Sequence, residues 1–373
     1  GHVFSTGGGG VAYLGVICDN SYKAGGVTGR GNPWGDPFDI DYVAHEMGHQ
    51  FGGSHTFNGT ASSCGGGNRS GSNAYEPGSG STIQAYAGIC GTQNLQANSD
   101  PYFHAISLQE MDAHIRDSGG NCAVTTTPDN TPPVIASIST GHTIPARTPF
   151  ALDAEASDVD GSNLTYTWEQ WDLGAAQSSA NPDDNGTRPI LRSYTPTLDS
   201  QRVIPRLSML LNNPLAADKG ELLPTTTRTL KFRLTVRDNA EPTGASSSAN
   251  ATLNVVNTGE PFAVTSPGTS PAPWLAGQSQ TVTWNVAGTD AAPISCPHVR
   301  IDLSDDGGVS FAHELTASAP NTGSADVIAP MAVTTEARIR VACANNIFFN
   351  LSPADFSIEA PLEPHVFSDG FED

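Results

Sequence analysis

Three histidines within eleven residues constrain this chain more than any other feature. His45, His49 and His55 stand in DYVAHEMGHQFGGSH, residues 41–55, with Glu46 after the first histidine and Gly52 before the third. On a helix His45 and His49 lie one turn apart on the same face, so both imidazoles can reach one ion. Gly52 permits the sharp turn that would bring His55 to that ion, because glycine adopts a left-handed backbone without steric penalty. The spacing predicts a metal site.

Three neutral histidines leave the fourth position of a tetrahedral zinc ion open, which is typical of a catalytic site. Glu46 leaves the helix about 100° round from His45. It is therefore not expected to be a ligand, but it can take a proton from a water at the metal. Five specified positions would arise by chance in such a chain on the order of once in 10,000. The apolar residues expected to bury this helix are Ile40, Val43, Met47 and Phe51.

Composition indicates an exported, β-rich protein. Charged residues make up 15% of the 373 positions, and 39 Gly with 27 Pro favour turns and strands over long charged helices. A net charge of -21 argues against nucleic acid as a partner. No stretch is apolar enough for a membrane span. Six cysteines without a C-x-x-C pair favour disulfides, and disulfides favour secretion to the extracellular space.

Breaks in the sequence pattern predict three domains and a tail. The linker AVTTTPDNTPP follows the cysteine-rich and histidine-rich part, and the turn-rich VNTGEPF separates two stretches with strand patterns. Leu230, Phe232, Leu234 and Val236 alternate with polar residues, as in a strand with one buried face. The expected parts are residues 1–126 with the histidine motif, the all-β sandwich domains 127–257 and 258–361, and the flexible acidic tail 362–373.

The stretch HEMGHQFGGSH resembles the metzincin zinc metallopeptidases. GVAYLGVICDNSYKAGGV, residues 10–27, is similar to the edge strand and following loop of their reprolysin-like branch. EPGSGSTIQAYAGICG, residues 76–91, and SDPYFHAISLQEMDAHI, residues 99–115, are similar to the Met-turn and closing helix of bacterial members. The resemblance implies an α+β metzincin-type catalytic domain. It also implies that this domain is partial, because relatives have most of a sheet and two helices before the edge strand.

The resemblance further implies contacts and cross-links. A peptide substrate would pair with the edge strand at Val11, Ala12, Tyr13, Leu14 and Gly15. The disulfides implied for the first domain are Cys18–Cys122 and Cys64–Cys90, and we expect Cys296–Cys343 in the last domain.

Two positions near the implied metal site need separate interpretation. Gln84 stands where the family places a methionine beneath the metal, and a buried amide there needs hydrogen-bond partners. Tyr86 matches the zinc-proximal tyrosine of astacin-like and serralysin-like metzincins. Its hydroxyl would either donate a hydrogen bond to the developing oxyanion or form a wall of the specificity pocket.

Other features give weaker signals. Residues 150–172 and 230–239 resemble immunoglobulin-like modules of the polycystic-kidney-disease type, split by an insertion around residues 173–228. Such modules bind extracellular glycans or surface ligands, or act as spacers. Asp158, Asp160 and Asn163 have the oxygen-rich pattern of a Ca²⁺ loop, but the EF-hand Glu is missing, which favours a solvent-facing turn. His104 and His114 are expected in core or surface roles.

The motif and the resemblance together predict a secreted zinc metalloendopeptidase. It would hydrolyse peptide bonds of protein substrates with Glu46 as the general base, and one Zn²⁺ at His45, His49 and His55 would be its cofactor. The alternative is a surface adhesion protein whose metzincin-like domain binds zinc but turns over poorly. Gln84 and the missing upstream segment are the reasons for considering it.

Overall fold

The computed structural model describes residues 1–127, 129–161, 163–181, 183–211, 219–269 and 271–361. The expected acidic tail, residues 362–373, lies outside the described residues. The chain divides into two compact units. The first unit holds the N-terminal part and the first sandwich, and the second holds the residues from Thr258 onward with two short upstream segments. Within the described ranges, no helix has the length and apolar character of a bilayer span.

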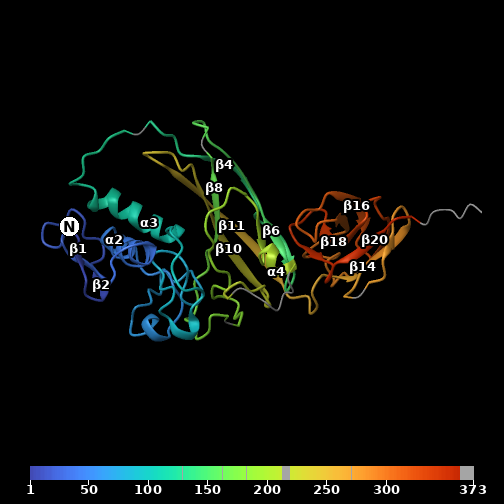
Figure 1. Ribbon diagram of the computed structural model, residues 1–373, viewed down its shortest axis with the longest axis horizontal. Helices are drawn as coiled ribbons and strands as arrows, with labels where there is room; N and C mark the ends of the chain where they lie inside the picture. The colour runs from blue at the N-terminus through green and yellow to red at the C-terminus, as the bar shows by residue number, and fades with distance from the viewer. Residues whose placement is uncertain (128, 162, 182, 212–218, 270, 362–373) are drawn as a thin grey trace, which may run out of the picture. The chain divides into compact units, whose positions relative to one another are not determined.

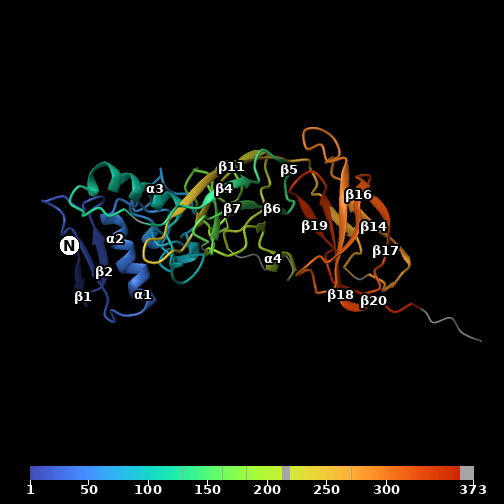
Figure 2. The same cartoon turned by 90° about the horizontal axis from the view of Figure 1, so that it is seen from above.

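The N-terminal part begins with a small mixed sheet that packs against a helical stretch. Strands β1 (Val3–Ser5) and β3 (Gly26–Gly29) run parallel, and β2 (Gly9–Ala12) pairs antiparallel with β3. The order β1-β3-β2 places β2 at an edge. The helical stretch comprises α1 (Asp36–Phe38), the π-helical turn η1 (Asp39–Ala44) and α2 (His45–Gln50), and it lies beside this sheet in Figure 2.

The buried face of α2 differs from the one that the apolar pattern predicted. Met47 is 39% exposed, whereas His45, Glu46, Gly48 and Gln50 are buried. The π-helical turn ahead of α2 has a wider repeat than an α-helix, so positions on its two sides do not follow one 3.6-residue stripe. The face that α2 turns inward is therefore the polar face that carries the histidines.

Loops with few regular elements connect this layer to the closing helix. The elements are η2 (Ser62–Cys64), η3 (Gly91–Gln93), α3 (Ala105–His114) and η4 (Ile115–Gly119). Phe57, Cys64 and Cys90 form a small buried core among these loops. Short backbone pairings such as the Phe57–Glu76 bridge, together with side-chain contacts and a disulfide, hold the region between α2 and α3 in place.

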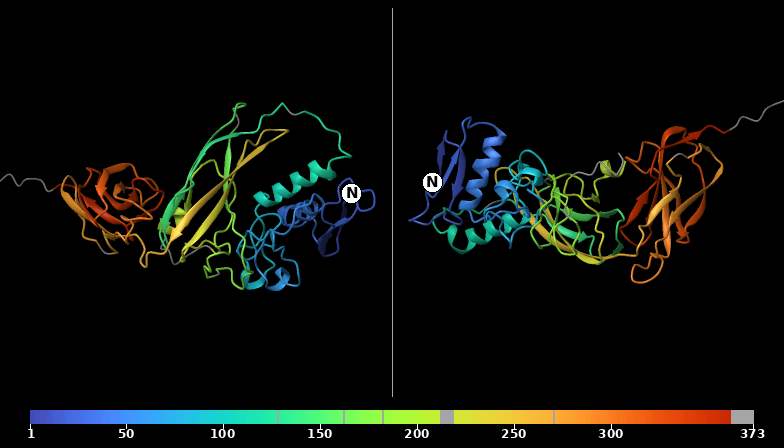
Figure 3. Two further views of the ribbon diagram at one scale, coloured as in Figure 1. Left: turned by 180° about the vertical axis from the view of Figure 1, so that it is seen from behind. Right: turned by 90° about the horizontal axis from the view of Figure 1, so that it is seen from below.

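The first sandwich has the strand pattern that the sequence predicts. One sheet has the order β5-β11-β10-β8, and β4 with β7 and β6 with β9 form two further pairs. Leu230, Phe232, Leu234 and Val236 on β10 are fully buried, as predicted. The long strands appear in yellow and yellow-green in Figure 1 and from two further sides in Figure 3. The bounds are β4 (Val134–Ile138), β5 (Thr143–Pro145), β6 (Phe150–Leu152), β7 (Ala154–Ser157), β8 (Thr165–Gln170), β9 (Arg202–Ile204), β10 (Arg228–Arg237) and β11 (Ser246–Val256).

The second unit is a further all-β sandwich. Its sheets have the orders β12-β14-β17 and β13-β20-β18-β15-β16, with β19 paired to β18. Val282, Ile301, Leu303 and Val341 are fully buried in its core. Its elements are α4 (Leu207–Leu211), β12 (Ala263–Ser266), β13 (Trp274–Leu275), β14 (Ser279–Asn285), β15 (His298–Ser304), β16 (His313–Pro320), β17 (Ser324–Ile328), β18 (Thr334–Cys343), β19 (Phe349–Leu351) and β20 (Phe356–Glu359).

The predicted fold class, a mixed α and β part followed by all-β sandwiches, is confirmed. The three-domain division with its boundaries near residues 126 and 257 stays a prediction. Within the first unit the N-terminal part and the sandwich contact each other directly. Glu169 on β8 accepts a hydrogen bond from the backbone N–H of Ala105 at 2.9 Å, and Arg237 on β10 donates to the carbonyl of Phe103 at 3.2 Å.

Candidate metal centre

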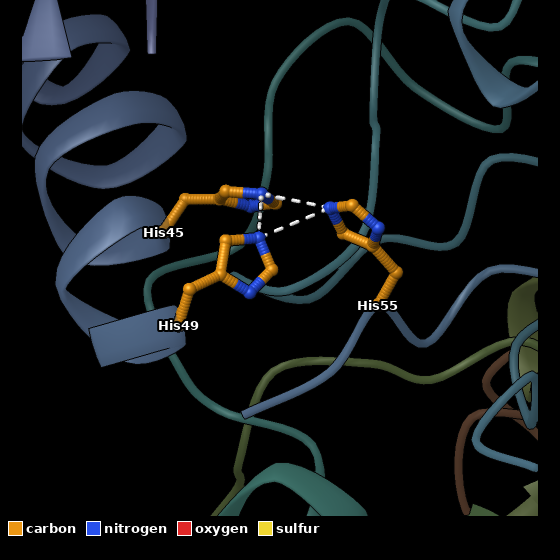
Figure 4. Close-up of side chains that lie close together, drawn as sticks. All are labelled: His45, His49 and His55. Atoms are coloured by element: carbon orange, nitrogen blue, oxygen red, sulfur yellow. Dashed lines mark hydrogen bonds between the residues drawn. The ribbon is translucent and has the colours of Figure 1, made fainter. Parts of the chain in front are cut away.

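Three imidazoles converge at the C-terminal end of the helical stretch. His45 and His49 project from α2, and the chain then turns back at Gly52, whose φ of 101° is in the left-handed region that favours glycine. The turn brings His55 opposite the helix, as Figure 4 shows. The Nε2 atom of His49 lies 3.0 Å from that of His45 and 3.1 Å from that of His55, and the third separation is 3.3 Å.

The other nitrogen of each ring points at a backbone carbonyl. Nδ1 of His45 lies 2.7 Å from the Ile83 oxygen, Nδ1 of His49 2.7 Å from the Gly53 oxygen, and Nδ1 of His55 2.6 Å from the Asn68 oxygen. A carbonyl oxygen only accepts, so each Nδ1 carries the proton and donates. The three Nε2 atoms then face one another as bare lone pairs. Such an arrangement is repulsive unless a cation lies between them.

Burial keeps these rings neutral, as metal ligands must be. Desolvation lowers the pKa of His45 well below its usual value, and neighbouring histidines lower it further. Burial also lowers the pKa of His49, and burial with the nearby His49 lowers the pKa of His55 to about 4. Near neutral pH all three rings therefore offer lone pairs rather than protons.

The geometry of the three nitrogens fits zinc. A tetrahedral ion with Zn–N bonds of roughly 2.0–2.1 Å holds its nitrogens about 3.3–3.4 Å apart. The observed separations of 3.0–3.3 Å need only a slight opening to reach that value. Among the residues that the structure describes, these three histidines are the group of His, Cys, Asp and Glu side chains placed to hold a metal. His104 and His114 do not belong to this group.

Glu46 lies beside the three histidines on the next helical position. It is 7% exposed, and burial raises the pKa of its carboxyl to about 7. Its Oε2 atom has no hydrogen-bond partner among the described residues. Gly10 on β2 packs directly against this carboxylate, and any side chain at position 10 would collide with it. The absence of a Cβ at Gly10 therefore lets the edge strand and the carboxylate lie next to each other.

Tyr86 packs against the ligand set from the other side. Its ring centroid lies 4.5 Å from that of His55 and 4.7 Å from that of Phe57, on which it stacks. Burial and the nearby Glu46 carboxylate raise the pKa of its phenol to about 12. Its hydroxyl is therefore a protonated donor at neutral pH. Both predicted roles of Tyr86, oxyanion donor and pocket wall, are compatible with this position.

Gln84 lies beneath the second ligand with only half of its amide satisfied. Its Nε2 lies 3.0 Å from Nδ1 of His49 and donates to the Gly53 carbonyl at 3.2 Å, the same oxygen that accepts from Nδ1 of His49. Its Oε1 has no hydrogen-bond partner in the described part of the chain, although the side chain is fully buried. Gly48 leaves room for this oxygen, because a Cβ there would collide with it.

A cleft of about 490 Å³ opens onto the centre. Gly10, Arg30, Tyr42, Glu46 and Tyr86 are among the residues that line it. The guanidinium of Arg30 lies 6.0 Å from the ring centroid of Tyr42. The cleft thus runs from the edge strand past the carboxylate to the loop that carries Tyr86. An extended chain can therefore reach the centre beside β2.

Comparison with known protein families finds a similarity in the same part of the chain. Residues 2–113 match the family described as Metallo-peptidase family M12B Reprolysin-like. The N-terminal part of the chain is reprolysin-like. The match includes the three histidines, Glu46, Gln84 and Tyr86, and it supports a zinc metallopeptidase of the hydrolase class. Comparison with curated proteins found no match.

Solved structures resemble the chain only loosely. The N-terminal Ig1-2 module of the Drosophila receptor protein tyrosine phosphatase DLAR is 12% identical, with a TM-score of 0.31 over 62% of this chain and 100% of that one. The fibronectin(III)-like modules of Clostridium thermocellum CbhA are 13% identical, with a TM-score of 0.20 over 62% of this chain and 97% of that one.

The five residues expected to pair with the substrate lie in and directly after the edge strand β2. Val11 and Ala12 lie in β2, and Val11 is 67% exposed. Tyr13, Leu14 and Gly15 follow the strand. The backbone N–H of Tyr13 already donates to Gly25 and that of Gly15 to His49, each at 2.8 Å. Substrate pairing along Val11–Gly15 stays a prediction.

Three disulfides are present, with the pairs that the resemblance and the cysteine positions predict. Cys64–Cys90 lies in the reprolysin-like part, Cys18–Cys122 joins that part to a residue just beyond the matched range, and Cys296–Cys343 lies in the second unit. No free cysteine remains.

The oxygen-bearing residues Asp158, Asp160 and Asn163, for which the sequence favours a solvent-facing turn over a Ca²⁺ loop, accept hydrogen bonds from protein groups. Asp158 accepts from the backbone N–H of Asp160 at 2.7 Å, and Asp160 accepts from that of Thr131 at 2.7 Å. The carbonyl of Asn163 accepts from the Asn239 side chain at 3.1 Å. The contact between Asp158 and Asp160 is typical of the turn that the sequence favours, and the weaker alternative of a Ca²⁺ loop stays a hypothesis.

Proposed function

We propose that this chain is a secreted zinc metalloendopeptidase that cleaves protein or peptide substrates. The observation that carries the proposal is the convergence of three unprotonated Nε2 atoms beside the buried carboxylate of Glu46, at the edge of an exposed strand. The match to the reprolysin-like family supports the same reaction class. The three disulfides support an oxidising compartment.

The edge strand β2 would hold the substrate backbone. A peptide that adds antiparallel to Gly9–Ala12 gains main-chain hydrogen bonds whatever its sequence, since every residue except proline offers both partners. Gly10 lies against Glu46, so the peptide bond opposite this residue is the one brought to the reacting centre. Pairing in this register would place the scissile bond beside Glu46.

Glu46 would move the proton. Zinc, when bound by the three histidines, supplies Lewis-acid polarisation of the substrate carbonyl and of the attacking water. The Glu46 carboxylate accepts the proton of that water and delivers it to the nitrogen of the leaving amine. Tyr86 would donate a hydrogen bond to the carbonyl oxygen as negative charge develops there, because its phenol remains protonated.

The test uses the full chain with casein and a quenched peptide library, with and without a chelator. We expect cleavage that is lost with the chelator and restored by zinc. Glu46→Gln keeps the side-chain shape and should keep one zinc per chain, while activity falls at least about 10²–10⁴-fold because the general base is removed. A Glu46→Gln variant with undiminished activity would contradict the role assigned to this residue.

A second candidate function has one observation in its favour. The unpartnered Oε1 of Gln84 beneath the ligands is a cost that a highly tuned active centre would avoid. An adhesion protein that binds zinc but turns over poorly would tolerate it, with the sandwich domains holding an extracellular glycan or surface ligand. Zinc binding without cleavage of any library peptide would favour this candidate.

A further inference from the structure

The third ligand is the one that the helix does not hold. His45 and His49 share α2, so one rigid element sets their separation. His55 lies in a loop beyond the turn at Gly52, and its ring orientation depends on the carbonyl of Asn68, which accepts from Nδ1 at 2.6 Å. Since no helix fixes the distance of His55 from the other two ligands, contacts of the loop itself have to set its position.

Arg69 connects that carbonyl to the first sandwich. It follows Asn68 directly, and its guanidinium donates to Oδ1 of Asn58 at 2.9 Å and to the backbone carbonyl of Gly174 at 3.0 Å. Gly174 belongs to the insertion in the sandwich sequence. Asn68 accepts from His55, and its neighbour Arg69 is thus anchored to Gly174 of the sandwich.

Gln177 of the same insertion pairs with residues 55–60, the loop that begins with His55 and is here named the ligand loop. Its backbone N–H donates to the carbonyl of Asn58 at 3.0 Å, and its Oε1 accepts from Nδ2 of Asn58 at 3.0 Å. Its carbonyl accepts from the hydroxyl of Thr60 at 3.2 Å and from Nε2 of Gln93 at 3.0 Å. Asn58 and Gln177 are both buried, and Asn58 lies three residues after His55.

The ligand loop is therefore the middle of three paired segments. On its other side Asn58 donates from its backbone N–H to Glu76 at 2.8 Å, and Gly59 donates likewise to Gly78 at 2.7 Å. A parallel bridge joins Gly59 to Gln177. Loss of the sandwich segment would leave the buried polar groups of Asn58 without partners on one side.

We propose that residues 174–177 of the first sandwich are a positioning element of the metal centre. They fix the loop that carries His55 and Asn68, and they thereby set the affinity for zinc. The inference rests on the zinc site of the proposed function but not on peptidase activity. It makes the sandwich a part of the metal centre rather than a spacer behind it.

The experiment compares two buried glutamines of the same sandwich in the full chain. Gln177→Ala removes the side-chain acceptor for Asn58. The control, Gln170→Ala, removes an equally buried amide whose Oε1 accepts from the backbone N–H groups of Ile190 and Leu191, each at 2.8 Å, and which does not contact the ligand loop. Zinc affinity is measured by competition with a chromophoric chelator, and the visible spectrum of the Co²⁺-substituted protein reports the ligand geometry.

We expect Gln177→Ala to weaken zinc binding about 10-fold, at the lower end of the usual effect of outer-shell partners, and to change the Co²⁺ spectrum. Gln170→Ala should lower the melting temperature while its zinc affinity stays within about twofold of the parent and its spectrum is unchanged. Equal losses of affinity in the two variants, or none in Gln177→Ala, would overturn the proposal.

A second variant covers the case in which Gln177→Ala does not fold. Arg69→Met removes the other tether to the sandwich, and Arg116→Met, at an exposed arginine paired with Asp112 on its own helix, is its control. Arg69→Met should weaken zinc binding and Arg116→Met should not, and the reverse result contradicts the inference. A parent chain that binds zinc but cleaves no substrate would refute the proposed function and leave this inference standing. The inference is tested by the zinc affinities of the variants and does not depend on cleavage.

Discussion

Replacing Gln84 with Met should stabilise the zinc-free protein. In the parent the fully buried Oε1 of Gln84 has no partner in the described structure, which costs about 1–3 kcal/mol. The variant loses the bond from Nε2 to the Gly53 carbonyl, worth about 0.5–1.5 kcal/mol. That carbonyl keeps the His49 donor. Since Met has a similar volume, the net gain is about 1 kcal/mol, or about 2–4 °C in melting temperature for a unit of this size.

The assay is calorimetry of the full chain in chelator, so that bound metal cannot mask the change. Gln93→Met is the matched control, because the Oε1 of Gln93 accepts from the backbone N–H groups of Thr60 and Ala61 at 2.6 and 2.8 Å. Two backbone donors lose their partner in that variant, so it should destabilise by about 1–3 kcal/mol. A Gln84→Met protein that melts below the parent would show that the amide is satisfied and refute the reasoning. Zinc affinity should change by less than about threefold in Gln84→Met, since His49 keeps its carbonyl partner.

Three further outcomes are expected. Tyr86→Phe should lower kcat about 10–1,000-fold with zinc content unchanged, because one hydrogen bond to the transition state is lost, and an unchanged kcat would make Tyr86 a pocket wall. The pKa of Asp184 lies below its usual value. Burial alone would raise this pKa, but hydrogen bonds from neighbouring backbone N–H groups and the Arg228 guanidinium lower it further than burial raises it. Its contribution is therefore present above about pH 4 and lost as the pH falls through the folded-state pKa, so the stability advantage over Asp184→Asn should stay constant down to about pH 4 and shrink below it in urea titrations. Replacing both Cys64 and Cys90 with Ala opens a loop with a sequence separation of 26 and should cost about 3–4 kcal/mol in urea unfolding, and an unchanged midpoint would contradict this.

The convergence of His45, His49 and His55 could be predicted from the sequence because it depends on local geometry. One helical turn separates the first two histidines, and a glycine turn brings back the third. The strand of the first sandwich with alternating apolar and polar residues could be predicted for the same reason. Successive side chains of any strand point to opposite faces of the sheet, so the pattern depends only on neighbouring residues.

What the sequence could not show depends on contacts between distant residues. The π-helical turn before α2 shifts its buried face, and nothing in the local pattern marks that insertion of a wider turn. The pairing of Asn58 with Gln177 spans 119 positions and joins parts that the linker pattern separates. The half-satisfied state of Gln84 likewise depends on which backbone carbonyl lies within reach of its amide.

The disulfide Cys18–Cys122 connects points near the two ends of the reprolysin-like part. Every residue from Asp19 to Asn121, including the three histidines and Glu46, lies inside the covalent ring that this bond closes. A single nick anywhere in that ring, whether by autolysis or by a neighbouring protease, leaves both fragments attached to each other. A nicked molecule would migrate as one species until reductant is added, and the fragments carrying the metal ligands could not diffuse apart.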